Sequence, residues 1–158
     1  MTVHWPVQVP ILVRERDCGP QGELDESALV VFFREARRAY LSVLNAGEEP
    51  CWSRVQELRI GVLRLASVDD DLAVRIRCDG VGRETFRFRY LVRDRVTDEV
   101  VAEATTVQAL EAHLGLGLFV SQEFRARLSA LEGRMLPDLD ACESEIDDAS
   151  VISNRFAG

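Results

Sequence analysis

Four carboxylates lie within a stretch of ten residues, at Asp17, Glu23, Asp25 and Glu26, with Cys18 among them. Carboxylates crowded in this way can raise one another's pKa, which is the state that a general base uses. A simpler interpretation of Asp25 and Glu26 is also open, because acids are favoured at the N-cap and in the first turn of a helix. Cys18 could be a nucleophile, but no histidine or basic partner is apparent nearby, and a small loop residue is the alternative.

The basic residues are all arginines, and lysine is absent from the 158 residues. This excludes Schiff-base chemistry on a lysine and the lysine of a phosphate-binding P-loop. The four cysteines contain no C-x-x-C pair and there are two histidines, so we expect neither a metal nor another cofactor. The net charge of −8 argues against binding to nucleic acid or to an anionic membrane.

No apolar run reaches about 18 residues, so the sequence predicts no membrane-spanning helix. The first residues, MTVHWPVQV, have neither the basic start nor the long apolar run of a signal peptide. We therefore expect a cytoplasmic protein with reduced cysteines.

The acidic stretch lies between two elements that must position it. Alternating apolar residues predict a strand over 7–16, and glycines and a proline predict a loop over 17–26. Apolar residues at helical spacing then predict a long helix over 27–44, capped by Asp25 or Ser27. Four further strands are predicted over 57–66, 71–79, 84–94 and 99–112, and a short helix over 121–133.

Short hairpins between the four later strands predict an antiparallel meander, and its apolar face must be covered by another element. The helix over 27–44 is the one long apolar element that the sequence offers. The fold class is therefore α+β, with a five-stranded antiparallel sheet wrapped around one long central helix. We expect one domain over 1–133 and a flexible acidic tail over 134–158, because the tail has little apolar surface to bury.

The junction between the first strand and the helix follows a recognisable pattern. Its matching residues are Val13, Arg14, Asp17, Cys18, Gly19, Gly22 and Leu24 and, after a spacing, the run Phe33-Arg34-Glu35-Ala36-Arg37. This stretch resembles the hotdog-fold acyl-CoA thioesterases of the 4-hydroxybenzoyl-CoA type. Weaker matches at Gly82-Arg83 and Ala102-Glu103-Ala104-Thr105 extend the resemblance over about residues 7–133.

The resemblance implies the hotdog fold and hydrolysis of a thioester, in which a carboxylate attacks the carbonyl or activates water. Gly19 stands where the family has its catalytic aspartate, and Glu23 stands where it has a histidine. Asp17, Glu23 and Glu26 are the candidates for the catalytic chemistry. Asp17 matches the family's first acid, which often serves only to brace the loop, so that role is open for Asp17 as well. By position, the backbone amide of Glu26 would hold the developing oxyanion at the start of the helix.

The same resemblance implies possible roles for two arginines, Arg37 and Arg83. Hotdog thioesterases of enediyne polyketide pathways lack the acid and depend on an arginine at the place of Arg37, which could polarise an acyl carbonyl. The alternatives are a solvated helix face that Arg37 shares with Arg34 and Arg38, or a salt bridge to Glu35. Arg83 could meet a coenzyme A phosphate, or it could be a free hairpin arginine. The candidate substrate-binding residues are Gly19, Gly22, Asp25 and Arg83.

The leading interpretation is a thioesterase that acts on an acyl-CoA or an acyl-carrier-protein thioester with an atypical active site. The alternative is a non-catalytic hotdog module that binds an acyl or aromatic ligand or a partner protein. A hydratase is a weaker third interpretation, because that chemistry typically uses an aspartate–histidine pair and the histidines here are His4 and His113. A short sheet leaves its edges exposed, so we expect a homodimer or a dimer of dimers with the site between subunits.

Overall fold

The computed structural model describes residues 2–45, 53–111 and 117–141. The chain begins with strand β1 (Val7–Leu12), a short 3₁₀ turn η1 (Glu15–Asp17) and helix α1 (Glu26–Leu44). Four long strands follow, β2 (Ser53–Val62), β3 (Asp71–Val81), β4 (Thr85–Asp94) and β5 (Val100–Glu111). The short strand β6 (Gly117–Leu118) and helix α2 (Gln122–Glu132) come last.

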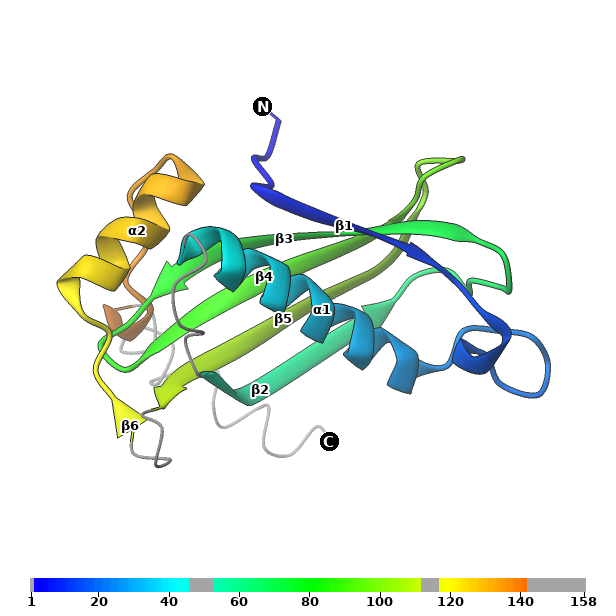
Figure 1. Cartoon of the computed structure of the whole chain (residues 1–158), viewed down its shortest axis with the longest axis horizontal. Helices are drawn as coiled ribbons and strands as arrows, with labels where there is room; N and C mark the ends of the chain where they lie inside the picture. Colours follow the sequence, from blue (N-terminus) through cyan, green and yellow to red (C-terminus); the bar gives the residue numbers. More distant parts are fainter. Residues whose placement is uncertain (1, 46–52, 112–116, 142–158) are drawn as a thin grey trace.

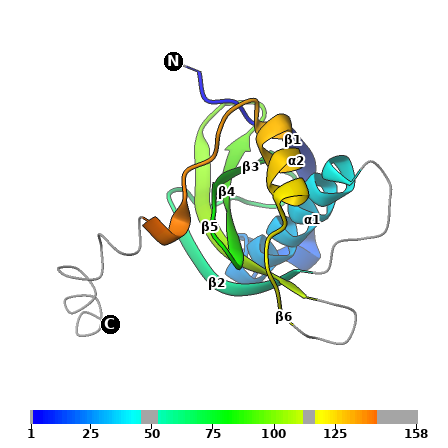
Figure 2. The same ribbon diagram turned by 90° about the vertical axis from the view of Figure 1, so that its left-hand side faces the viewer.

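Helix α1 lies across one face of a single antiparallel sheet (Figure 1). The strand order is β1-β3-β4-β5-β2, and β6 pairs with the end of β5. The sheet curves around α1, which lies closest to β1 and β3 (Figure 2). The predicted five-stranded antiparallel sheet around one long helix is therefore confirmed.

Aromatic side chains join α1 to β4 in the core. Phe33 and Tyr40 are seven residues apart and so lie on one face of α1. The rings of Phe33 and Tyr90 have centroids 4.8 Å apart, and Tyr40 meets Phe88 edge-on at the same distance. None of the four side chains is more than 1% exposed. Each such burial contributes about 1.5–3 kcal/mol, so these two pairs fix the helix on the sheet.

Both helices begin at a residue whose side chain caps them. Asp25 is the N-cap of α1, one of the two caps predicted. Ser121 caps α2 by accepting a hydrogen bond from the Phe124 amide (3.0 Å), and Gly133 ends α2 in the left-handed conformation (φ +68°).

Within the described ranges, no helix combines the length and the apolar composition needed to cross a membrane.

The predicted meander is wrong at one connection. Strand β2 pairs with β5 and not with β3, which follows it along the chain. The segment between them forms no hairpin because it bonds to the end of β1 instead. The Val13 amide donates to the Asp70 carbonyl (3.0 Å), and the Asp69 amide donates to the Val13 carbonyl (2.9 Å). Strand β1 therefore takes the position beside β3, and β2 lies at the opposite edge.

Two strand boundaries also differ from the predicted ones. The first strand ends at Leu12 and not at 16, because residues 15–17 fold into η1. Strand β2 covers 53–62 and not 57–66. It ends early because the amides of Leu63 and Arg64 both turn to the Val101 carbonyl (2.9 and 3.2 Å).

The start of the predicted acidic tail is packed on the domain. The Val81 amide donates to the Pro137 carbonyl (3.0 Å), and Leu139 is buried against Gly80. A side chain at Gly80 would clash with Leu139, so glycine is needed for this close approach. The remainder of the tail, from residue 142, lies outside the described residues, and its flexibility stays a prediction.

A buried carboxylate ties α2 to α1 and to β3. Glu132 is 3% exposed, and its Oε1 accepts hydrogen bonds from the Tyr40 hydroxyl (2.6 Å) and from the Cys78 amide (2.7 Å). Burial raises the pKa of Glu132. Glu132 therefore stabilises the fold through the two hydrogen bonds to its oxygen more than through its negative charge.

Replacing Glu132 by leucine leaves two buried donors without an acceptor. We expect Glu132→Leu to lower the free energy of unfolding by about 2–6 kcal/mol, at about 1–3 kcal/mol for each of the two unsatisfied groups. Glu132→Gln keeps an oxygen in the same place and should cost less than about 1 kcal/mol. Urea denaturation measures both values, and equal losses in the two variants would contradict the role given to this oxygen.

Candidate functional site

The loop between β1 and α1 is held by bonds from its own backbone. Asp17 Oδ2 accepts a hydrogen bond from the Arg14 amide (3.0 Å), and the Asp17 carbonyl accepts one from the Asp25 amide (2.9 Å). The Leu24 amide donates to the Ala66 carbonyl (2.8 Å), which joins the loop to the segment after β2. Asp17 therefore braces the loop at the base of α1.

A tight turn at the tip of this loop requires one of its two glycines. Gly22 has a φ of +79°, where glycine meets no steric cost, and its amide donates to the Gly19 carbonyl (3.0 Å). The Gly19 amide in turn donates to the Glu23 carbonyl (2.8 Å). A Cβ at Gly19 would meet nothing nearer than that carbonyl oxygen, at 3.9 Å. The backbone thus leaves room for a side chain at position 19.

Asp25 closes the N-terminus of α1. Its Oδ1 accepts hydrogen bonds from both the amide and the hydroxyl of Ser27, each at 3.0 Å. The bond from the Ser27 amide holds the pKa of Asp25 below its usual value. A raised pKa, as expected for crowded acids, is therefore wrong for Asp25, because capping bonds stabilise its charged form.

The other two acids of the junction keep their carboxylates free. Glu23 and Glu26 are exposed, and neither side chain forms an ion pair or a hydrogen bond with the described residues. The Glu26 amide likewise has no acceptor in that part of the chain, as expected at the first position of a helix. A helix N-terminus carries partial positive charge, so this amide can donate to an oxyanion.

A cavity of about 260 Å³ lies beside this end of α1. Its lining residues are Leu24, Glu26, Leu29, the segment 62–66 and Val101. The cation among them, Arg64, is neutralised by Asp94 (2.8 Å) and by Glu99 (3.1 Å). The cavity is therefore mostly apolar and borders the start of the helix.

Neither a reactive thiol nor a metal site adds to the junction in the described part of the chain. Burial raises the pKa of the half-buried Cys18 thiol, and the charge of Asp17 raises it further. The thiol is thus protonated at neutral pH, which favours the loop-residue interpretation of Cys18. No group of three or more His, Cys, Asp or Glu side chains among the described residues could hold a metal ion.

A second set of polar side chains lies around Arg37, between α1 and the sheet. Arg37 Nη1 donates to the Tyr90 hydroxyl (3.3 Å), which is hydrogen-bonded to Thr106 Oγ1 (2.8 Å). Gln108 Nε2 also donates to Thr106 Oγ1 (2.6 Å). Tyr90, Thr106 and Gln108 are fully buried. Arg37 is therefore half-buried and oriented by a buried network, and it does not lie free on a solvated helix face.

The candidate residues come together only in part. Those gathered at the junction are Asp17, Gly19, Gly22, Glu23, Asp25 and Glu26. Arg37 lies eleven residues beyond Glu26, or about 16 Å along the helix axis at 1.5 Å per residue. Arg83 lies in the β3–β4 turn, at the opposite end of the sheet from the start of α1 (Figure 1). Its guanidinium lies 5.0 Å from the ring centre of Phe119, so one chain does not bring Arg83 to the junction.

Thr106 and Gln108 have no role in the predictions from sequence. The sequence did contain a signal for them. Residues 102, 104, 106 and 108 alternate along the strand predicted over 99–112, so Thr106 and Gln108 share the inward-facing side of Ala102 and Ala104. A polar side chain in that phase must find a buried partner. Tyr90 is in the core, as its alternation in the sequence predicts, but only the structure shows that its hydroxyl is that partner.

Comparison with solved structures finds similar proteins, whereas comparison of the sequence with family models and with curated proteins finds none. No protein-family model matches the sequence, and no curated protein matches it. A thioesterase from Thermus thermophilus, complexed with coenzyme A and Zn, matches with a TM-score of 0.72 and 28% sequence identity. The match covers 82% of this chain and 97% of that chain. The chain has the hotdog fold.

Two more distant hotdog structures agree with this assignment. A 1,4-dihydroxy-2-naphthoyl-CoA thioesterase from Synechocystis has a TM-score of 0.67 at 15% identity, covering 79% of this chain and 96% of that chain. A probable thioesterase from Escherichia coli has a TM-score of 0.65 at 17% identity, covering 78% and 97%. At these identities the likeness shows the fold alone, and this is the fold that the junction residues implied.

Removing the cap of α1 should destabilise the protein in a pH-dependent way. We expect Asp25→Ala to lower the urea midpoint at pH 7, whereas Asp25→Asn keeps a capping oxygen and loses only the part of the stability that comes from the charge. The folded-state pKa of Asp25 is lowered, so the stability from its charge is present above about pH 4 and is lost as the pH falls. Urea unfolding curves should show that the wild type is more stable than Asp25→Asn at pH 7 and that this difference shrinks at pH 3. A difference in stability that does not change with pH would contradict this.

Proposed function

We propose that the chain is a thioesterase that hydrolyses an acyl-CoA or an acyl-carrier-protein thioester with an atypical active site. One observation carries the proposal, namely that the free amide of Glu26 stands at a helix N-terminus that borders a mostly apolar cavity. A thioester carbonyl at this place would receive a hydrogen bond as negative charge develops on its oxygen. The likeness to the Thermus thermophilus thioesterase, which is complexed with coenzyme A, supports the same class of substrate.

The hydrolytic step needs a base, because Gly19 carries no carboxylate. Water would attack the carbonyl carbon while a carboxylate takes its proton; the C–S bond then breaks and the thiol leaves with that proton. Glu23 and Glu26 have free carboxylates for this task, whereas Asp17 uses one oxygen to brace the loop. We therefore rank the two glutamates above Asp17 as the base.

Arg37 is the proposed cation of the site. A guanidinium held by Tyr90 keeps further N–H donors, which could polarise the acyl carbonyl. Arg37 lies about 16 Å from Glu26 of the same chain, too far for both to contact one carbonyl. Both could serve one substrate if two subunits face each other, so the composite site is part of the proposal.

Strand β2 is the edge at which we propose that a second copy pairs. It is ten residues long and lies at the end of the sheet, whereas the opposite edge strand β1 contains Pro10. Proline cannot donate to a neighbouring strand, so β1 is the poorer partner. Val55, Leu58 and Val62 of β2 are 36–43% exposed in the single chain, and antiparallel pairing of two β2 strands would bring these side chains together.

Thiol release from a panel of acyl-CoA and acyl-pantetheine thioesters tests the activity. We expect the wild type to release thiol and Arg37→Gln to lower kcat/KM by about 10²–10³, the loss typical when a donor to the oxyanion is removed. Arg38→Gln is the matched control, because Arg38 lies next in the same helix with its side chain 70% exposed. It should stay within about twofold of the wild type.

Two results would contradict this proposal. One is no release above background with any thioester. The other is release that is unchanged in Asp17→Asn, Glu23→Gln, Glu26→Gln and Arg37→Gln, each measured on a protein whose fold is verified by circular dichroism.

The alternative function is a non-catalytic hotdog module that binds an acyl or aromatic ligand or a partner protein. Its support is the glycine at position 19, which the backbone does not require. Binding of an acyl-CoA without turnover would favour this alternative. Gly19→Asp fits the space at the loop and separates the two cases: gain of thiol release by this variant, with none in the wild type, would show a binding protein that lost its base.

The proposed dimer predicts the effect of charges placed on β2. Leu58→Asp should convert a wild-type dimer into a monomer, because it puts a carboxylate between the apolar side chains of Val55 and Val62 at the proposed interface. Val96→Asp is the control, since Val96 is 82% exposed and lies beyond the end of β4. Light scattering at micromolar concentration measures both, and a monomeric wild type would overturn the assembly and the composite site.

A further inference from the structure

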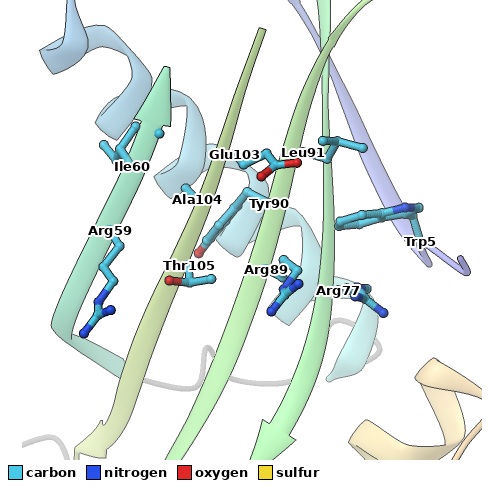
Figure 3. A pocket seen from close by; sticks show the side chains of 11 residues that line it. Trp5, Arg59, Ile60, Arg77, Arg89, Tyr90, Leu91, Glu103, Ala104 and Thr105 are labelled. Carbon is cyan, nitrogen blue, oxygen red and sulfur yellow. The ribbon is translucent and has the colours of Figure 1, made fainter. Parts of the chain in front are cut away.

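The convex face of the sheet, which points away from α1, carries a row of three arginines and one threonine. Arg59 of β2, Thr105 of β5, Arg89 of β4 and Arg77 of β3 are directly paired positions on four neighbouring strands. Directly paired residues share a face of the sheet. Figure 3 shows the three guanidinium groups of this arginine row reaching toward the same side.

Acids neutralise two of these arginines through one nitrogen each. Asp79 Oδ2 pairs with Arg89 Nε (3.0 Å), but Asp79 is shared with Arg87 (2.7 Å). Glu57 Oε1 pairs with Arg59 Nε (2.6 Å). No bond to the Nη groups of Arg59 or Arg89 occurs among the described residues, so these donors are available to a ligand.

Arg77 has no acid partner in the described part of the chain. Its guanidinium lies 5.1 Å from the ring centre of Trp5, and its Nε is buried without a hydrogen bond. Arg77 is also directly opposite Arg89, and like charges at directly opposed positions destabilise a sheet. The charges of Asp79 and Glu132 reach Arg77 without a direct ion pair. The fold therefore leaves this guanidinium with no carboxylate in contact, an arrangement that favours a bound anion.

A pocket of about 470 Å³ lies over this row. Leu91, Thr105 and the carboxylate of Glu103 line it beside the arginines, and Trp5 stands at its β3 side (Figure 3). Its volume lies within the usual range for small-ligand sites, about 300–1,000 Å³. A guanidinium presents a planar fork of donors that matches phosphate oxygens, and a threonine hydroxyl can donate to the same group.

We propose that the pocket over the arginine row binds a small ligand that carries a diphosphate or two neighbouring phosphates, held by Arg59, Arg77 and Arg89 beside Trp5. The site lies on the face of the sheet opposite to α1 and is separate from the proposed thioester site. A second copy of the chain is a poorer occupant, because a twofold contact through this face would set one arginine row against another. Nucleic acid is a poorer occupant because the chain carries a net charge of −8.

Titration of the full-length protein with inorganic pyrophosphate and with adenosine diphosphate tests the site. We expect both to bind with Kd below about 1 mM by isothermal titration calorimetry. In a Trp52→Phe background Trp5 is the one remaining tryptophan, so a change in its fluorescence reports binding at this pocket. Tighter binding of the nucleotide would identify a nucleoside diphosphate, and equal binding would identify the diphosphate group itself; either result supports the site.

Arg77→Gln should weaken binding of both probes by about tenfold, the effect of losing one charge-assisted contact. Arg75→Gln is the matched control, because Arg75 lies on the same strand and face but is bonded to Gln8 (3.0 Å). Binding should change less than about threefold in this control. Absence of binding, equal losses in the two variants, or a dimer that Arg77→Gln abolishes would each overturn the proposal. Thiol release measured on the same proteins keeps this outcome separate from that of the proposed function.

Discussion

Burial of one helix by one sheet is the interaction on which the rest of the structure depends. The apolar face of α1 meets β4 through the pairs Phe33–Tyr90 and Tyr40–Phe88, and these contacts set the position of the helix across the sheet. Because α1 lies closest to β1 and β3, it leaves β2 largely uncovered. This off-centre position leaves the concave face of β2 open, and the strand order makes β2 a free edge as well.

Polar groups enter the buried layer only where each has a partner. Gln108 donates to Thr106, Thr106 bonds to the Tyr90 hydroxyl, and this hydroxyl accepts from the half-buried Arg37. One turn further along α1, Glu132 satisfies two buried donors from different elements, the Tyr40 hydroxyl and the Cys78 amide. An unpaired polar group at either place would cost about 1–3 kcal/mol, so these bonds restrict how α1 and α2 can sit on the sheet.

The two faces of the sheet differ in charge and in what they can bind. On the concave side, a helix N-terminus and the free carboxylate of Glu26 border an apolar cavity, which suits a neutral acyl group with a carbonyl that gains charge. On the convex side, paired strand positions align arginines whose donors are only partly used. A single layer of strands separates these environments, so each can be changed by mutation without removing the other.

The sequence by itself determined the elements that depend on short-range physics. Helical spacing, the Asp25 cap and the alternation in β3 and β4 predicted those spans within two residues, because these signals act between neighbours along the chain. The resemblance at the junction also gave the fold. Only the tertiary structure decided that β2 pairs with β5, that Arg83 lies far from the junction, and that Tyr90, Thr106 and Gln108 orient Arg37. These features depend on which strands meet across the sheet, and that choice is made by the burial of the whole core, which no local pattern encodes.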